Sequence, residues 1–120
     1  MNLIKLNNLQ KTVLVVAGSD PSGGAGIQAD LKTLTSFGVY CMTAITALTE
    51  QNTNGVFDIF EIPLEFVVKQ INCCLSDINA NAVKIGMLHN ADLISAVLET
   101  LNKNNIVGNK NVNIVLDPVM

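Results

Sequence analysis

Arginine is absent from this chain, and all seven basic residues are lysines. Ten Asp and Glu residues outnumber them and leave a formal net charge of -3. A surface that binds nucleic acid needs clustered positive charge to neutralise phosphates, and no basic stripe runs through this sequence. The composition therefore argues against DNA or RNA as a partner.

Long apolar runs are also missing. Runs such as residues 13–17 and 114–116 are far shorter than the roughly 20 residues that a membrane-spanning helix needs. The start of the chain, residues 1–8, holds a lysine but no apolar core of the signal-peptide kind. We therefore expect no membrane partner and a cytoplasmic protein.

Cysteine and histidine are too few and too scattered for a recognised metal site. Adjacent Cys73 and Cys74 cannot easily bridge each other, so we interpret them and Cys41 as reduced thiols. His89 is the only histidine and belongs to no ligand spacing pattern. We predict no metal centre among these residues, partly buried and inert Cys73 and Cys74, and an ordinary loop histidine.

What the chain does have is apolar residues, at 49%, in alternating strand-like and helix-like patterns. Its 120 residues allow one core, hence one domain or part of one. We expect strands at 12–16, 39–48, 56–62 (an edge or hairpin), 82–85 and 112–116, and helices at 27–37, 63–77 and from 91 after an Asn90 cap. This alternation predicts a doubly wound α/β fold with a mostly parallel sheet and helices on both faces.

The glycine-rich stretch AGSDPSGGAGIQAD, residues 17–30, joins the first expected strand to the first helix. Glycines let a backbone approach a ligand closely, and the helix that follows points its N–H groups back into the loop. In parallel sheets ligands bind outside the carboxyl ends of the strands. We therefore expect the segments after four strands to converge on one crevice: 18–26, 49–52, 86–89 and 117–120.

Two nucleotide-binding motifs are present only in part. Residues 18–23 begin like a P-loop, but Gly24-Ala25 stands where Lys-Ser/Thr is required. Residues 24–29 match the form G-x-G-x-x-A, but they lie beyond the strand end, and Glu50 is the nearest candidate for a ribose-binding acid. An oxidoreductase hypothesis predicts nicotinamide cofactor binding. A titration with such a cofactor that gives no binding signal would exclude this hypothesis.

Several residues of the expected crevice have both a structural and a functional interpretation. Asp30 is either a charge in the first helical turn or an acceptor for a ligand amine. Gln51 is either a loop residue or an amide suited to a heteroaromatic ring edge. Met87 and Val119 fit a core as well as a pocket wall. Asp117 closes an apolar strand, where a buried carboxylate is costly unless it has a use.

Four blocks of the sequence resemble the hydroxymethylpyrimidine/phosphomethylpyrimidine kinase family of thiamine biosynthesis, which has the ribokinase-like fold. In order they are AGSDPSGGAGIQADLK (17–32), ITALTEQNTNGV (45–56), VKIGML (83–88) and VLDPVM (115–120). The resemblance implies that residues 1–120 form the amino-terminal, pyrimidine-binding half of a single ribokinase-like domain. An incomplete sheet of this kind would leave an unpaired edge.

The resemblance also implies a reaction. Family members use ATP and Mg²⁺ to phosphorylate 4-amino-5-hydroxymethyl-2-methylpyrimidine and then its monophosphate. By motif, polar contacts to the pyrimidine would come from Gly18, Asp30 and Gln51, and pocket walls from Met87, Val119 and Thr49, which stands where the family usually has valine. Asp117 would lie toward the phosphate and Mg²⁺.

The family's Gly-Thr-Gly-Cys-like anion-hole turn and its ATP-binding loops belong to a later segment, so we expect no catalytic residue in this chain. We expect a homodimer or a complementing carboxyl-terminal chain as the protein partner. Two alternatives stay open, a truncated non-catalytic remnant or binding module and a pyridoxal kinase of the same family. Gln51→Ala would test the second, because hydroxymethylpyrimidine binding should depend on this amide more than pyridoxal binding does.

Overall fold

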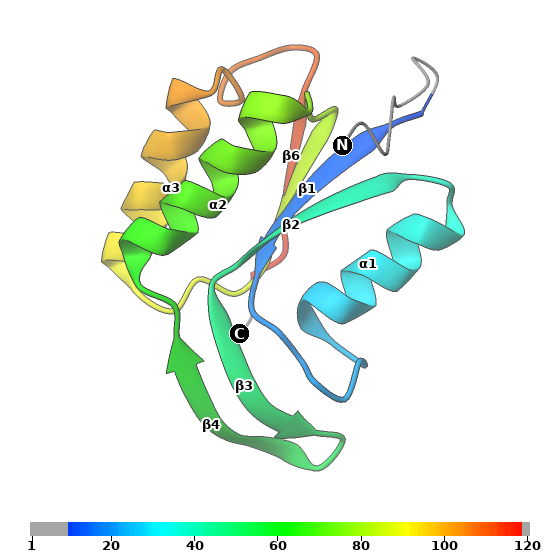
Figure 1. Cartoon of the computed structure of the whole chain (residues 1–120), viewed down its shortest axis with the longest axis vertical. Helices are drawn as coiled ribbons and strands as arrows, with labels where there is room; N and C mark the ends of the chain where they lie inside the picture. The colour runs from blue at the N-terminus through cyan, green and yellow to red at the C-terminus, as the bar shows by residue number, and fades with distance from the viewer. Residues whose placement is uncertain (1–9, 119–120) are drawn as a thin grey trace.

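A four-stranded parallel sheet forms the centre of the structure, a computed structural model that describes residues 10–118 (Figure 1). The strand order is β2-β1-β5-β6. The strands are β1 (Thr12–Ala17), β2 (Tyr40–Ile45), β5 (Ala82–Ile85) and β6 (Asn113–Leu116). β1 is rich in valine and almost fully buried, as expected for a parallel strand covered on both faces. The parallel sheet predicted from the sequence is confirmed.

Helices cover both faces of this sheet, as predicted. α1 (Gly26–Ser36) packs on one face, while α2 (Leu64–Asp77) and α3 (Ala91–Lys103) pack on the other (Figure 1). The predicted cap is confirmed, because the Asn90 side chain accepts a hydrogen bond from Leu93 N at 2.8 Å. The larger core lies under α2 and α3 and includes Leu14, Val16, Ile71, Val83 and Val97.

The predicted strand 39–48 is in fact broken at Thr46. β3 (Ala47–Asn52) pairs antiparallel with β4 (Gly55–Glu61) in a separate two-stranded sheet that projects from the main one (Figure 1). The expected hairpin is confirmed, but the prediction that 49–52 is a loop after a strand is wrong. Its polar residues are compatible with a strand because the hairpin has exposed positions on β3 and β4.

Thr46 joins the hairpin to the sheet. It is fully buried; its N–H donates to the Ala17 carbonyl at 2.9 Å, and its carbonyl accepts from Ile62 N at 3.0 Å. Its hydroxyl donates to the Met87 carbonyl at 2.9 Å. The base of the hairpin is therefore bonded to the ends of both β1 and β5.

The strand order contains a switch point beside β1. The chain passes from β1 to β2 on one side and later returns to β5 on the other side of β1. Loops that leave two such strands diverge and open a crevice at their carboxyl ends.

Within residues 10–118, no helix is long and apolar enough to cross a membrane.

Candidate ligand-binding site

A cavity of about 430 Å³ lies at the switch point, where the loops after β1 and β5 meet the β3–β4 hairpin. The described residues predicted for the site all line it: Gly18, Asp30, Thr49, Gln51, Met87 and Asp117. Val119 lies outside the described residues. The structure therefore brings together positions from four separate segments of the sequence, as the crevice prediction requires.

The loop after β1 is built around Asp20, a residue that the sequence patterns did not indicate. Asp20 is 2% exposed and accepts hydrogen bonds from Ser22 N at 2.9 Å, Ser22 Oγ at 2.6 Å, Gly24 N at 2.9 Å and Ala25 N at 2.8 Å. The Ser22 hydroxyl is the main reason that the pKa of Asp20 is lowered, although burial acts in the opposite direction. A buried carboxylate therefore organises this loop from within.

This arrangement changes the expected role of the loop N–H groups. Those of Gly24 and Ala25 donate to Asp20, and Ile27 N donates to the Gly18 carbonyl at 2.9 Å. These donors are used inside the loop rather than offered to an anion. The loop shapes the cavity wall and does not act as a phosphate cradle through these groups.

Two glycines allow the close packing of this wall. Gly26 has a φ of +57°, and a Cβ there would lie 2.5 Å from the Gly18 carbonyl oxygen. A Cβ at Gly18 would lie 2.7 Å from the terminal methyl of Met87. A side chain at either position would therefore force the loop or Met87 to move.

Asp30 lies deeper in α1 than predicted. The helix begins at Gly26, and its first turn holds no acidic residue, so Asp30 is not an N-terminal capping charge. Its Oδ2 instead pairs with Lys84 Nζ at 2.9 Å, with each side chain 21% exposed. Lys84 was missed because its partner is 54 positions away, although a lysine inside the apolar strand Ala82–Ile85 was a usable signal.

Gln51 and Thr49 reach the cavity from β3. The Thr49 hydroxyl donates to the Ser19 carbonyl at 2.8 Å and lies 3.1 Å from Gln51 Oε1. Thr49 is thus a polar link between the loop and Gln51, which a valine at this position could not provide. The apolar side of the hairpin wall comes from Val56 and Ile59 of β4.

Asp117 follows β6 at the open end of the cavity. Its backbone N donates to the Ile85 carbonyl at 2.9 Å, which continues the β5–β6 pairing. The side chain is 68% exposed, and Oδ2 lies 3.6 Å from Lys84 Nζ. This carboxylate is therefore not buried as predicted, because β6 is an exposed edge strand. Its place in the cavity wall remains as predicted.

The histidine and cysteines do not line this cavity. The His89 side chain is 11% exposed, with Nε2 3.6 Å from Glu61 Oε2. Burial, with a smaller effect of Asp30, raises the pKa of Cys41 to about 11, and burial also raises that of Cys74. Cys73 is exposed, not partly buried as predicted. In the described part of the chain, no three His, Cys, Asp or Glu residues are grouped so as to hold a metal ion.

Comparison with known proteins shows which family this chain resembles. The family model of phosphomethylpyrimidine kinase matches residues 20–120. The hydroxymethylpyrimidine/phosphomethylpyrimidine kinase of Escherichia coli is 48% identical over 107 residues, which cover 89% of this chain and 38% of that protein. The relative from Haemophilus influenzae is 49% identical and is covered to 39%, with 92% of this chain aligned.

Solved structures give the same result. The crystal structure of phosphomethylpyrimidine kinase from Clostridium difficile matches with a TM-score of 0.83 and 46% identity, covering 92% of this chain and 46% of that one. Pyridoxal kinase from Staphylococcus aureus, solved with AMP-PCP and pyridoxal, matches at 0.78 and 37%, covering 92% and 40%. The chain spans less than half the length of each of these relatives. With its ribokinase-like fold, it belongs to the phosphomethylpyrimidine kinase family.

Proposed function

We propose that this chain supplies the pyrimidine-binding part of an ATP-dependent kinase of thiamine biosynthesis. The substrates would be 4-amino-5-hydroxymethyl-2-methylpyrimidine and its monophosphate. One observation carries the proposal: a single cavity holds the Asp30 carboxylate and the Gln51 amide beside the apolar Met87, Val56 and Ile59. A flat aminopyrimidine offers a donor and acceptors at its edge and apolar faces, which such a cavity complements.

The charge of the cavity supports a neutral ring as the ligand. Two carboxylates, Asp30 and Asp117, and one ammonium group, Lys84, are the charged groups among the described lining residues. They leave one net negative charge, which disfavours an anionic ring and favours hydrogen-bond donors. The volume of about 430 Å³ lies within the range of small-molecule sites.

We assign Asp117 to the side where phosphates and Mg²⁺ would bind. Its carboxylate is exposed at the mouth of the cavity, and carboxylate oxygens suit Mg²⁺ when phosphates supply the other ligands. The ion would neutralise charge on the transferred phosphoryl group. We propose no catalytic base in this chain, and the residues of the ATP site would come from further polypeptide.

The binding proposal is tested by titration calorimetry of the chain with 4-amino-5-hydroxymethyl-2-methylpyrimidine. Gln51→Ala and Asp30→Asn should each weaken binding by about tenfold or more, because each removes a polar contact in a sheltered site. Glu50→Gln is the matched control, since Glu50 is an exposed neighbour on β3 outside the cavity lining. Unchanged affinity in both site variants would contradict the proposal.

Pyridoxal is the second candidate ligand, favoured by the structural match to the pyridoxal kinase of S. aureus. The same titration with pyridoxal separates the two possibilities. We expect Gln51→Ala to weaken aminopyrimidine binding by about tenfold or more and to weaken pyridoxal binding less. Equal loss for both compounds would show that Gln51 does not discriminate between them.

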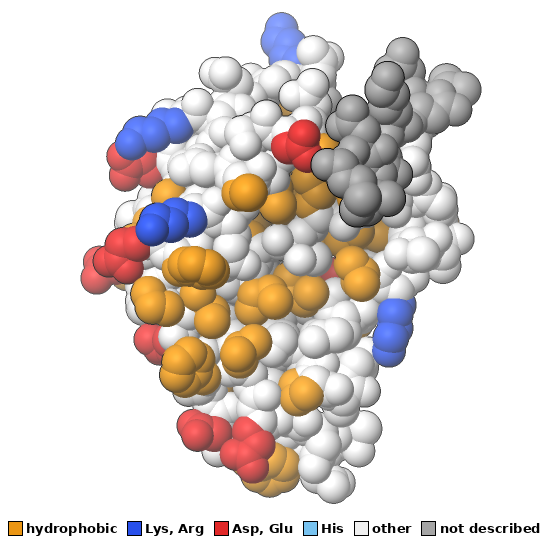
Figure 2. Space-filling view, in the orientation of Figure 1, with side chains coloured by type: hydrophobic (Ala, Val, Ile, Leu, Met, Phe, Trp, Pro, Cys, Tyr) orange, Lys and Arg blue, Asp and Glu red, His pale blue; other side chains and the backbone are white. Residues whose placement is uncertain are grey.

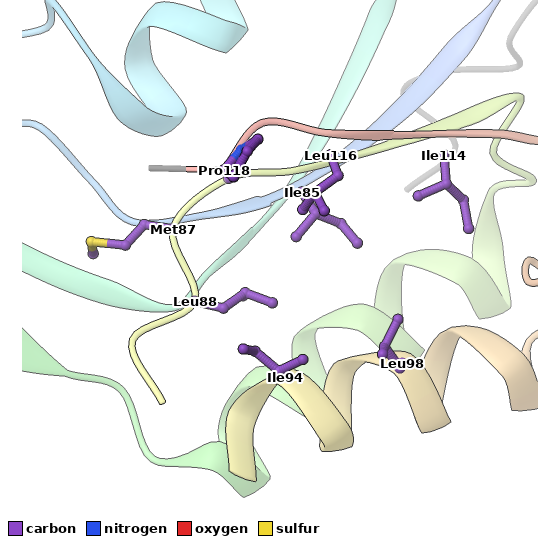
Figure 3. A pocket seen from close by; sticks show the side chains of 9 residues that line it. Ile85, Met87, Leu88, Ile94, Leu98, Ile114, Leu116 and Pro118 are labelled. Carbon is purple, nitrogen blue, oxygen red and sulfur yellow. The ribbon is translucent and has the colours of Figure 1, made fainter. Parts of the chain in front are cut away.

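An apolar groove of about 400 Å³ suggests how the protein partner binds. Ile94 and Leu98 of α3 face Ile114 and Leu116 of β6 across it (Figure 3). The β6 side chains Ile114, Val115 and Leu116 are 40–64% exposed, so both faces of this strand lack cover. We propose that further kinase-domain polypeptide, in the same or a complementing chain, adds a strand beside β6 and a helix over the groove.

Co-expression with the carboxyl-terminal part of the E. coli relative tests this partner. We expect co-purification and phosphorylation of the aminopyrimidine, both reduced by Leu116→Glu, which would place a charge in the groove. Apolar side chains gather on the face shown in Figure 2. The exposed aromatic residues among those that the structure describes include Phe57, Phe60 and Phe66. Sedimentation of the chain alone tests the expected homodimer.

If the co-expressed complex binds the aminopyrimidine without phosphorylating it, this result would favour the alternative that the chain is a non-catalytic binding module.

A further inference from the structure

Lys84 lies between two carboxylates in the wall of the cavity. Its Nζ is 2.9 Å from Asp30 Oδ2 and 3.6 Å from Asp117 Oδ2. Lys84 and Asp30 are each 21% exposed, whereas Asp117 is 68% exposed. The contact with Asp30 is shorter and better sheltered from water, so it is the stronger of the two.

Both members of this pair stand on well-anchored elements. Lys84 belongs to β5, which is hydrogen-bonded to β1 on one side and to β6 on the other. Asp30 belongs to α1, which packs against β1 and β2. Because neither backbone moves easily, an ion pair between these side chains orients the carboxylate itself.

The pair also sets what Asp30 can offer to a ligand. Among residues 10–118, the hydrogen bond and ion pair of the Asp30 side chain use Oδ2. Because Asp30 lines the cavity, this pairing leaves its other oxygen, Oδ1, for a ligand. A neutral amino group donates a hydrogen bond but does not neutralise a carboxylate, so the Lys84 cation beside Asp30 offsets the charge that the ligand leaves uncompensated.

We propose that Lys84 is a positioning residue: it holds Asp30 Oδ2 so that Oδ1 points at the amino group of the pyrimidine. This inference rests on the proposed function and extends it to the origin of amine recognition. Lys84 acts through Asp30 and does not touch the ligand. Its effect is therefore confined to ligands that carry the amino group.

The test is titration calorimetry with two probes, 4-amino-5-hydroxymethyl-2-methylpyrimidine and the analogue that lacks the amino group. Lys84→Met should weaken binding of the amino compound by about tenfold and leave the analogue within about twofold. Lys84→Arg retains the cation and should restore most of the affinity. Lys103→Met is the control, because it removes an exposed ion pair with Glu99 on α3, and it should change neither affinity.

Equal loss for both probes in Lys84→Met would show a merely structural role and overturn the proposal. The phosphorylated pyrimidine is titrated as a third probe. A loss confined to it would also overturn the proposal, since Lys84 would then be a phosphate ligand. If the wild-type chain binds neither probe, the proposed function fails. A double-mutant cycle of Lys84→Met with Asp30→Asn in urea unfolding then decides whether Lys84 holds Asp30. We expect non-additivity of about threefold or more in the unfolding equilibrium constant, and additivity would contradict that contact.

Discussion

Strands β1 and β6 have similar apolar sequences and opposite surroundings. In β1 the residues from Leu14 to Ala17 are at most 1% exposed, whereas Ile114, Val115 and Leu116 of β6 are 40%, 55% and 64% exposed. β1 lies inside the sheet between two partners, and β6 forms its edge. Burial of an apolar strand is therefore decided by its position in the sheet and not by its composition.

The segments that follow these strands differ in the same way. After β1, Asp20 is buried and bonded to three residues of its own loop. After β6, Asp117 is exposed and only loosely paired with Lys84. The cavity wall after β1 is thus held by hydrogen bonds within its own loop, whereas the Asp117 side chain after β6 is exposed and loosely held.

The largest expected effect on stability comes from a substitution in the buried strand β1. Leu14→Ala should lower the free energy of unfolding by about 2–5 kcal/mol, because it leaves a cavity under α2 and α3. Leu116→Ala should cost about 0.5 kcal/mol or less, because that side chain is already largely exposed. Urea unfolding monitored by circular dichroism measures both values. Similar losses would mean that β6 is covered in solution.

A smaller effect is expected at Gly26, the first residue of α1. Gly26→Ala should cost about 1–3 kcal/mol and weaken ligand binding, since its Cβ would meet the Gly18 carbonyl. Gly38→Ala is the matched control: its φ is also positive, at +73°, but a Cβ there meets nothing within 4 Å. Thermal unfolding of the two variants measures how much more Gly26→Ala destabilises the fold than Gly38→Ala does. This difference separates the cost of the steric clash from the cost of the positive φ. Equal destabilisation would contradict the tight packing at Gly26.

The pH dependence of stability should distinguish the buried Asp20 after β1 from the exposed Asp117 after β6. Because the folded pKa of Asp20 lies below its ordinary value of 3.8, its contribution to stability is present above that value and is lost as pH falls through the folded pKa. Asp20→Asn removes this contribution, so its unfolding free energy should change less with pH between about pH 5 and 3. Asp117→Asn, on the exposed end of β6, is the comparison. Parallel curves for wild type and Asp20→Asn would refute the role of Asp20.

The smallest effect concerns Cys41 on β2, next to β1. Its pKa of about 11 comes first from burial and then from the Asp30 carboxylate. Asp30→Asn should therefore lower the pKa of Cys41 slightly and leave it above the ordinary 9.0. The pH dependence of iodoacetamide alkylation at Cys41, followed by peptide mass spectrometry, measures the shift. Glu50→Gln should leave the profile unchanged.

Local patterns predicted the elements well because they depend on neighbours in sequence. The valine-rich run of β1, the Asn90 cap and the amphipathic helices all follow from periods of two to four residues. The break at Thr46 was missed because the segment ITALT is continuously strand-like, and its interruption depends on bonds to Ala17 and Met87. Lys84 was missed for the same kind of reason, since it acts through a residue 54 positions away.

Thr46 has a further consequence for how sequences of this fold can vary. This one residue uses its N–H, carbonyl and hydroxyl to bond the ends of β1 and β5 and the first residue after β4. Valine has the same shape but lacks the hydroxyl, and it would leave the Met87 carbonyl without that donor. In a library of random substitutions selected for ligand binding, we expect position 46 to keep threonine or serine, while Leu48, two positions further along β3 and 45% exposed, varies widely. We therefore expect the buried Thr46 to restrict sequence variation at the base of the hairpin more strongly than exposed hairpin residues do.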